Sequence, residues 1–229
     1  MLFNLSFKIF LRELRSGYLT SILVSLVLAI TIVSGISLFT DRLEKALSAE
    51  TEEFLGGNLK FESNQNTAKN KIQGQDFQDI DFMEMVLFAS VIFSEEDMQL
   101  SSVKAVDNAY PLIGELELQN KYGKFLSKES PELGTVWMDA RLQNLLNLSY
   151  GDKIFLGDSE FIFAATILYE PDRASGNFAF APKTIMNFED VDSTNIIQPG
   201  SRVEYNYLFK GPEDAVANVR KYLETIKEN

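Results

Sequence analysis

Paired carboxylates are the side chains in this sequence that could do acid–base chemistry. Asp152 and Asp158 each follow a glycine, and Glu170 lies two residues before Asp172. Two carboxylates with different pKa values can act as general acid and general base. Turns favour Asp for backbone reasons alone, however, and neither pair has a nucleophile or metal ligand beside it. We therefore expect both pairs to be structural, and we predict no catalytic residue.

A run of three acidic residues, Glu95 to Asp97, could in principle bind Ca²⁺. A calcium loop needs oxygen ligands at spaced positions and a glycine that turns the chain, and this run has neither. A solvated turn between two strands is the better interpretation, and we predict no metal site.

The composition excludes several classes of function. The 229 residues include neither histidine nor cysteine, so Ser-His-Asp and Cys-His enzymes and thiolate metal sites are excluded. The net charge of −12 disfavours a nucleic acid partner, because phosphates need cationic residues. We expect no cofactor and no enzymatic activity in this chain.

The strongest signal is an uncharged run at residues 18–39, YLTSILVSLVLAITIVSGISLF. As a helix these 22 residues would extend about 33 Å, enough to cross a hydrocarbon core of about 30 Å. A cleaved signal peptide fits less well, because charged residues lie between the end of the run and the first plausible cleavage site. We predict one transmembrane helix.

The flanks of this run differ in charge and in pattern. Basic residues precede it and acidic residues dominate after it, which predicts a cytoplasmic N-terminus and an external C-terminal part. Residues 1–17 form an amphipathic pattern that could lie in the inner interface and contact membrane lipid, or could simply orient the span. The residues that we expect at this interface are Phe7, Lys8, Arg12 and Arg15.

An apolar stripe continues beyond the span, through residues 40–57. Leu43, Leu47 and Phe54 recur among charged residues until Gly56-Gly57, a typical helix stop. We expect a stalk helix here that joins the span to a folded domain.

The rest of the chain alternates short strand patterns with turn signals. We predict helices at 77–82, at 140–146 and from Pro212 onward, and a loop-like run through 183–200. Strands are predicted at 58–62, 85–93, 99–106, 113–118, 153–156, 160–168 and 202–209.

Several runs resemble one family of membrane proteins. RELRSG at 12–17, FTDRLEKAL at 39–47 and LGGNL at 55–59 resemble the start of FtsX-like permeases, which carry a MacB-type core domain. A narrower resemblance, to the YbbP-like branch, is carried by four longer runs. These are VKAVDNAYPLIGELEL at 103–118, VWMDARLQNLLNLSYGDKIFLGDSEFIF at 136–163, EPDRASGNFAFAPKTIM at 170–186 and QPGSRVEYNYL at 198–208.

The resemblance implies an α+β fold in which one transmembrane helix and its stalk precede a MacB-type periplasmic core domain. It implies a Porter-like α/β part at 58–110 and 187–229, and an inserted β-rich Sabre-like part at 111–186. Relatives continue into further spans, whereas no second apolar run of comparable length occurs here. We therefore expect the chain to be a piece of a longer permease.

The resemblance also implies a function. The chain would be the N-terminal part of an ABC transporter permease in the inner membrane, with residues 40–229 in the periplasm. A separate cytoplasmic ATPase would act through the rest of the permease and move an external domain that handles a lipid, a lipoprotein or a hydrophobic compound. The alternative is a single-pass anchored binding or sensor domain without transport. Glu170, Asp172 and Arg173 are the candidate contacts to a partner or to a second permease half, or else a local ion pair.

Overall fold

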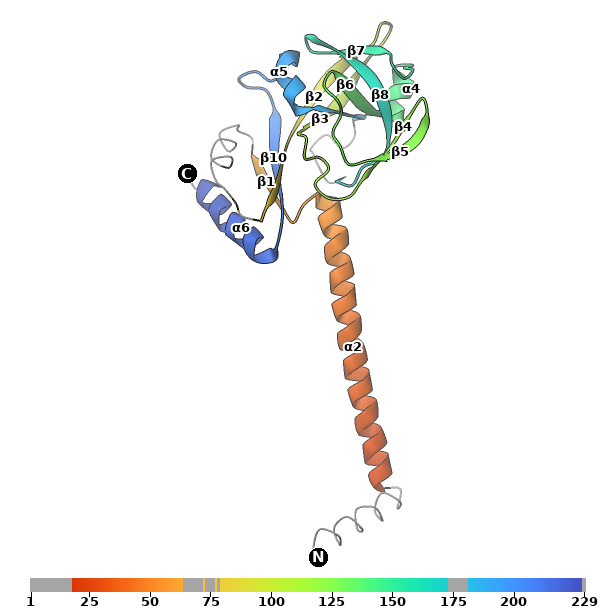
Figure 1. Ribbon diagram of the computed structural model, residues 1–229, viewed down its shortest axis with the longest axis vertical. Helices are drawn as coiled ribbons and strands as arrows, with labels where there is room; N and C mark the ends of the chain where they lie inside the picture. The colour runs from red at the N-terminus through yellow and green to blue at the C-terminus, as the bar shows by residue number, and fades with distance from the viewer. Residues whose placement is uncertain (1–17, 64–71, 73–76, 78, 173–180, 228–229) are drawn as a thin grey trace, which may run out of the picture. The chain divides into compact units, whose positions relative to one another are not determined.

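The computed structural model describes residues 18–63, 72, 77, 79–172 and 181–227. The chain divides into two compact units, residues 1–50 and 51–229. The first unit contributes most of one long helix, and the second contains a mixed β-sheet with short helices (Figure 1). The α+β class expected from the sequence is confirmed.

Helix α2 runs unbroken from Tyr18 to Leu55. Its apolar part, Thr20–Lys45, is long enough to cross a membrane, and its side chains are exposed. The hydroxyl groups of Ser25 and Thr31 donate to the carbonyl oxygens of Ser21 and Val27, so they need no partner from lipid. The predicted span and stalk therefore form one helix.

The helix ends where the sequence predicts. Gly56 follows Leu55 with φ +75°, the left-handed conformation that closes many helices and that glycine adopts most readily. The N–H group of Asn58 then donates to the carbonyl of Phe209, at 2.9 Å. The chain thus passes directly from the helix end into the sheet.

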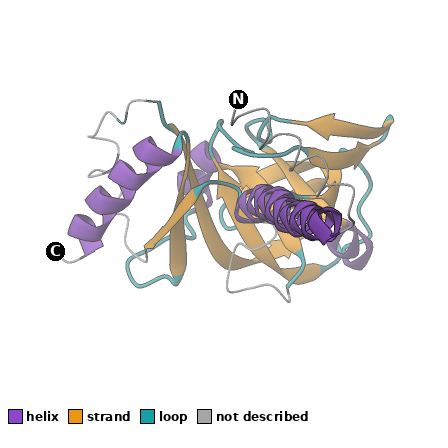
Figure 2. Cartoon of the chain, turned by 90° about the horizontal axis from the view of Figure 1, so that it is seen from below, coloured by secondary structure: helices purple, strands orange, loops and turns teal. Residues whose placement is uncertain are grey.

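The described part of the second unit is built on one ten-stranded sheet, in the order β1-β10-β2-β3-β9-β6-β8-β4-β5, with β7 pairing β2 and β8. Figure 2 shows the strands of this unit in orange. Parallel pairs occur at β3–β9 and β6–β8, and all the other pairs are antiparallel. The strands are β1 (Leu59–Ser63), β2 (Asp81–Phe93), β3 (Met98–Val106), β4 (Leu116–Asn120), β5 (Gly123–Ser127), β6 (Thr135–Asp139), β7 (Lys153–Leu156), β8 (Ser159–Tyr169), β9 (Lys183–Asn187) and β10 (Val203–Lys210).

Apolar residues cover both faces of the central strands. In β2, Val86, Phe88 and Ile92 enter one core cluster, whereas Met83 and Met85 enter a second cluster on the other face. A strand buried on both faces carries a near-continuous apolar run, which is why β2 is recognisable in the sequence. Because the two core clusters consist of different residues, the two faces of the sheet can have different functions.

Short helices cap the sheet. α4 (Ala140–Leu145) begins at Asp139, whose carboxylate accepts the N–H of Leu142 at 2.7 Å. α6 (Glu213–Lys227) buries Val216, Val219 and Leu223, of which the last two pack in the first core. Both helices were predicted from the sequence.

Two local predictions are wrong. The proposed helix at 77–82 is not formed by its described residues, because Asp81 and Phe82 begin β2 and pair with Lys210 and Phe209 of β10. The proposed loop at 183–200 contains β9, the 3₁₀ helix η1 (Phe188–Asp190) and α5 (Val191–Thr194).

Strand β9 escaped prediction because it lies between β3 and β6 in the middle of the sheet. Two consecutive residues of β9, Ile185 and Met186, are both fully buried, so no polar–apolar alternation marks the strand. Its polar residue Thr184 is buried in contact with the hydroxyl of Ser101, at 2.8 Å. The start of β4 at Leu116, rather than at residue 113, is a smaller difference.

The boundaries of the Porter-like and Sabre-like parts stay predictions. Strand β9 falls within the range assigned to the insert except for its last residue, Asn187, yet it pairs with β3 outside that range. The same sheet therefore continues across the expected boundary.

Candidate functional site

A buried lysine lies at the centre of the candidate site. Lys104 is on β3 and pairs in register with Leu87 of β2, so its side chain lies on the sheet face of the second core. Its exposed fraction is 0%. Because a buried ammonium group without partners costs several kcal/mol, this residue requires compensating charge.

Two carboxylates from the end of β8 supply that charge. The Lys104 Nζ atom donates to Glu170 Oε1 at 2.6 Å and forms a second ion pair with Asp172. Tyr110 completes the group: its hydroxyl donates to Glu170 and Asp172, at 3.1 Å each. The Lys104 ammonium also lies 4.6 Å from the centre of the Tyr110 ring. We call these four residues, together with Lys183, the ion cluster.

Lys183 balances the charge of the cluster. Its ammonium group pairs with the second oxygen of Glu170, and its side chain is 24% exposed. Among the described residues of the ion cluster, two lysines therefore face two carboxylates, and their formal charges sum to zero. Such a set tolerates burial because each charge has an opposite charge in direct contact.

The pKa shifts follow from burial and from these contacts. Burial alone would lower the pKa of Lys104, but Asp172 and Glu170 raise it above 10.5, so the residue is charged at neutral pH. Burial opposes ionisation of Glu170 as well, yet Lys104 and Lys183 lower its pKa to about 2. Burial and the neighbouring Glu170 raise the pKa of Asp172, and burial raises that of Tyr110. Tyr110 is therefore a neutral donor.

The ion cluster touches the residue that follows helix α2. A Cβ atom added to Gly56 would lie 2.7 Å from the Cβ of Asp172 and 3.0 Å from the side chain of Leu208. Only a glycine fits this close approach in this backbone conformation. The end of the helix thus packs directly on a charged group of the sheet domain.

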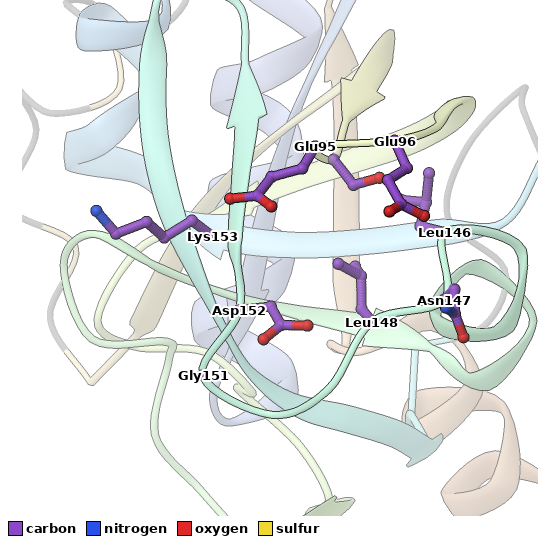
Figure 3. A pocket seen from close by; sticks show the side chains of 9 residues that line it. Glu95, Glu96, Leu146, Asn147, Leu148, Gly151, Asp152 and Lys153 are labelled. Carbon is purple, nitrogen blue, oxygen red and sulfur yellow. The ribbon is translucent and has the colours of Figure 1, made fainter.

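A second candidate is a polar cleft of about 440 Å³ beside the β2–β3 turn (Figure 3). Glu95 and Glu96 line one side, Asp152 lies on the other, and Lys153 extends away from them. Asp152 accepts the N–H of Ser149 at 2.7 Å, which is the turn role expected for it. Among the described residues, no group of acidic side chains is arranged to hold a metal ion.

Comparison with known proteins adds a relative. No family model matches the chain. Over 214 residues, or 93% of the chain, it is 35% identical to a protein of Escherichia coli (strain K12) described as "Uncharacterized ABC transporter permease YbbP". The chain is therefore similar to one segment of an ABC transporter permease. The match covers 26% of the length of YbbP, so the chain spans about a quarter of that relative.

Solved structures give more distant likenesses of this permease segment. The periplasmic region of MacB from Actinobacillus actinomycetemcomitans covers 73% of the chain, and 75% of that structure is covered, with 12% identity and a TM-score of 0.47. The extracellular domain of the ABC-type transporter YknZ from Gram-positive bacteria covers 67% of the chain and is itself covered over 76%, with 8% identity and a TM-score of 0.45. Because both TM-scores are below 0.5, the likeness to a permease rests on the sequence identity with YbbP.

The site residues predicted for the permease fall in different places. Glu170 and Asp172 are buried and make the local ion pair that was the alternative to a partner contact; Arg173 lies outside the described residues. Leu43 and Leu47 are exposed on α2, and the structure does not describe the side chain of Phe54. The expected interface residues also lie outside it: Phe7, Lys8, Arg12 and Arg15. Contact of any of these residues with lipid or with a partner stays a prediction.

Lys104, Tyr110 and Lys183 were not predicted as site residues from the sequence. One signal was present: Lys104 is the only charged residue between Asp97 and Asp107, in a segment with the character of a buried strand. A charge in such a segment indicates a partner elsewhere in the chain. Its partners are 66 and 68 residues away, and only the fold brings them together.

Proposed function

We propose that this chain is the part of an ABC transporter permease in which a membrane-spanning helix moves an external domain. A separate cytoplasmic ATPase subunit supplies the energy and acts through parts of the permease that this chain does not include. The external domain handles a lipid, a lipoprotein or another hydrophobic compound, as the resemblance to FtsX-like permeases implies.

The contact between Gly56 and Asp172 carries this proposal. Helix α2 has no break between Tyr18 and Leu55, and the next residue packs on a buried charged group of the sheet. A displacement of the helix end would therefore act on the core of the domain rather than on a surface loop. Because buried ion pairs resist separation, the contact is a suitable point for transmitting force.

The orientation is proposed from charge. Lys8, Arg12 and Arg15 precede the span, and acidic residues outnumber basic ones over residues 41–53, which favours a cytoplasmic N-terminus, an inner-membrane span and a periplasmic domain from residue 40 onward. The absence of cysteine gives a direct test, because every introduced cysteine is unique. In intact cells a membrane-impermeant maleimide should label Tyr122→Cys, at an 86% exposed position, but not Ser6→Cys. The reverse labelling would overturn the orientation.

The coupling is tested in the complete permease, reconstituted with its ATPase in nanodiscs. A dye on Tyr122→Cys, with a quencher on the lipid head groups, reports movement of the domain relative to the membrane. ATP should change the quenching. Insertion of Gly-Gly-Ser between Glu50 and Thr51, which interrupts α2, should abolish the change while ATP hydrolysis continues.

A matched insertion controls for added length. The same three residues placed between Lys121 and Tyr122, in the turn between β4 and β5, should leave the ATP-dependent change intact. If the α2 insertion also leaves it intact, the helix does not transmit movement. If ATP never changes the quenching, the anchored binding domain becomes the better interpretation.

A further inference from the structure

We propose that the outer face of strands β2, β3, β7 and β8 is a docking surface for a separate protein whose contacting surface is apolar at its centre and basic at its rim. The surface consists of Phe93, Met98, Leu100, Phe155 and Ile162, and we call it the apolar face. This inference goes beyond the proposed function and does not depend on coupling to ATP.

Strand register places these residues on one face. Phe93 pairs directly with Met98 of β3 and with Phe155 of β7. Leu100 is two residues from Met98 on the same strand, and Ile162 pairs with Lys153, two residues from Phe155. Directly paired residues, and residues two apart on a strand, point to the same side of a sheet.

The opposite side of the same strands is already used. Ile92, Ile154, Leu156, Phe161 and Phe163 alternate with the exposed residues and are buried in the first core. The exposed residues are therefore not needed for that core. Each of these strands nevertheless carries an apolar residue on its solvent side, and the described contacts give that residue no role in folding.

The size of the apolar face fits a protein interface. The exposed fractions of its side chains are 44% for Phe93, 69% for Met98, 50% for Leu100, 43% for Phe155 and 45% for Ile162. At about 200 Å² for a fully exposed large side chain, they present about 500 Å² of apolar surface. This is near the upper end for the largest patch on a monomer, and it would form the centre of a standard interface of about 800 Å² per partner.

The charges around the apolar face select the partner. Glu95, Glu96 and Asp97 are exposed at the tip of the β2–β3 hairpin, directly between Phe93 and Met98 in sequence. Lys153, the basic residue of this face, is paired with Glu160 at 2.8 Å. The rim is therefore acidic. Two copies of this face would bring like charges together, and an anionic lipid surface would be repelled, whereas a basic rim on the partner would be attracted.

The test uses the full chain in nanodiscs of neutral lipid and two short labelled peptides as probes. In one peptide leucine alternates with lysine, and in the other leucine alternates with glutamate. We expect saturable binding of the lysine peptide, at least about tenfold tighter than that of the glutamate peptide. The double variant Met98→Gln, Leu100→Gln should weaken binding of the lysine peptide about tenfold or more.

Two further variants separate charge from apolar contact. Neutralising the rim with Glu95→Gln, Glu96→Gln and Asp97→Asn should reduce the preference for the lysine peptide. The control Tyr122→Gln, Leu126→Gln changes two exposed apolar residues of the β4–β5 hairpin, which are 86% and 66% exposed, and should leave binding unchanged. Fluorescence of Trp137 checks that each variant is folded.

Four outcomes would overturn the proposal. Equal binding of both peptides removes the charge argument. Unchanged binding by Met98→Gln, Leu100→Gln places the site elsewhere. Self-association in sedimentation that this double variant abolishes makes the occupant a second copy. Binding to phosphatidylglycerol vesicles that the same variant abolishes makes it a lipid surface.

Discussion

Replacing Lys104 with methionine tests whether the ion cluster is a set of buried charges. Methionine keeps most of the volume and removes the ammonium group, which leaves Glu170 and Asp172 buried without the contact to Lys104, while Lys183 still pairs with Glu170. At 2.6 Å and an effective dielectric constant of about 20, the Lys104–Glu170 attraction alone is about 6 kcal/mol. The cost of burying the lysine offsets part of this attraction.

Breaking a buried ion pair by removing one partner typically costs about 3–5 kcal/mol. For a domain of this size, that loss lowers the unfolding temperature by about 6–20 °C. We expect Lys104→Met to fall in this range. The second substitution Asp172→Asn should recover part of the loss, because it removes one of the two carboxylates left behind.

Urea unfolding in detergent, followed by the fluorescence of the single tryptophan, is a suitable assay. Trp137 is 7% exposed and lies in the same core cluster as Tyr110, so its emission reports on this part of the domain. Lys124→Met is the matched control, because Lys124 is 65% exposed and its pair with Glu117 is 3.4 Å long. The control should cost less than about 1 kcal/mol. If Lys104→Met cost no more than the control, the carboxylates would not be buried charges.

Four further predictions concern stability, measured in the same way. Because the pKa of Glu170 is lowered from 4.5 to about 2, its carboxylate stabilises the fold by about 3 kcal/mol at pH values above 4.5. This stabilisation is lost as the pH falls from 4.5 to about 2. Glu170→Gln should remove that loss. Asp172→Asn should remove a change of opposite sign, because a raised carboxylate pKa stabilises the fold as the pH falls through it. Gly56→Ala should lower the free energy of unfolding by more than Gly200→Ala does. Gly200→Ala should lower it by about 1–2 kcal/mol because of the positive φ alone, since the added Cβ meets no atom within 4 Å. Leu223→Ala should cost about 2–4 kcal/mol by leaving a cavity under α6.

The features that local chemistry determines were predictable. The uncharged run gives the span, Gly56 gives the helix end, and the glycines at 151 and 157 mark the ends of β7. Gly157 shows how strict such a position is, because an added Cβ would lie 2.0 Å from the carbonyl oxygen of Thr194. These signals act within a few residues of one another, so a single sequence carries them.

The features that depend on distant pairing were not predictable. Strand β9 is stabilised by β3 and β6, and nothing in its own residues marks it as a strand. The ion cluster has the same origin: Glu170 and Asp172 look like loop residues until β8 carries them to Lys104. A lysine inside an apolar strand indicates that partners exist without indicating where they are.

Strand β2 has a consequence for how the domain can respond to a pull. Its 13 residues pair with β10 at one end, with β3 along most of the length, and with β7 at the other. Sharp bending between the two ends would strain the ladder hydrogen bonds of β2 and the packing of the two core clusters that its buried residues enter. The domain should therefore behave as a stiff lever, in which a small stroke at Gly56 arrives at the far hairpin with its amplitude undiminished.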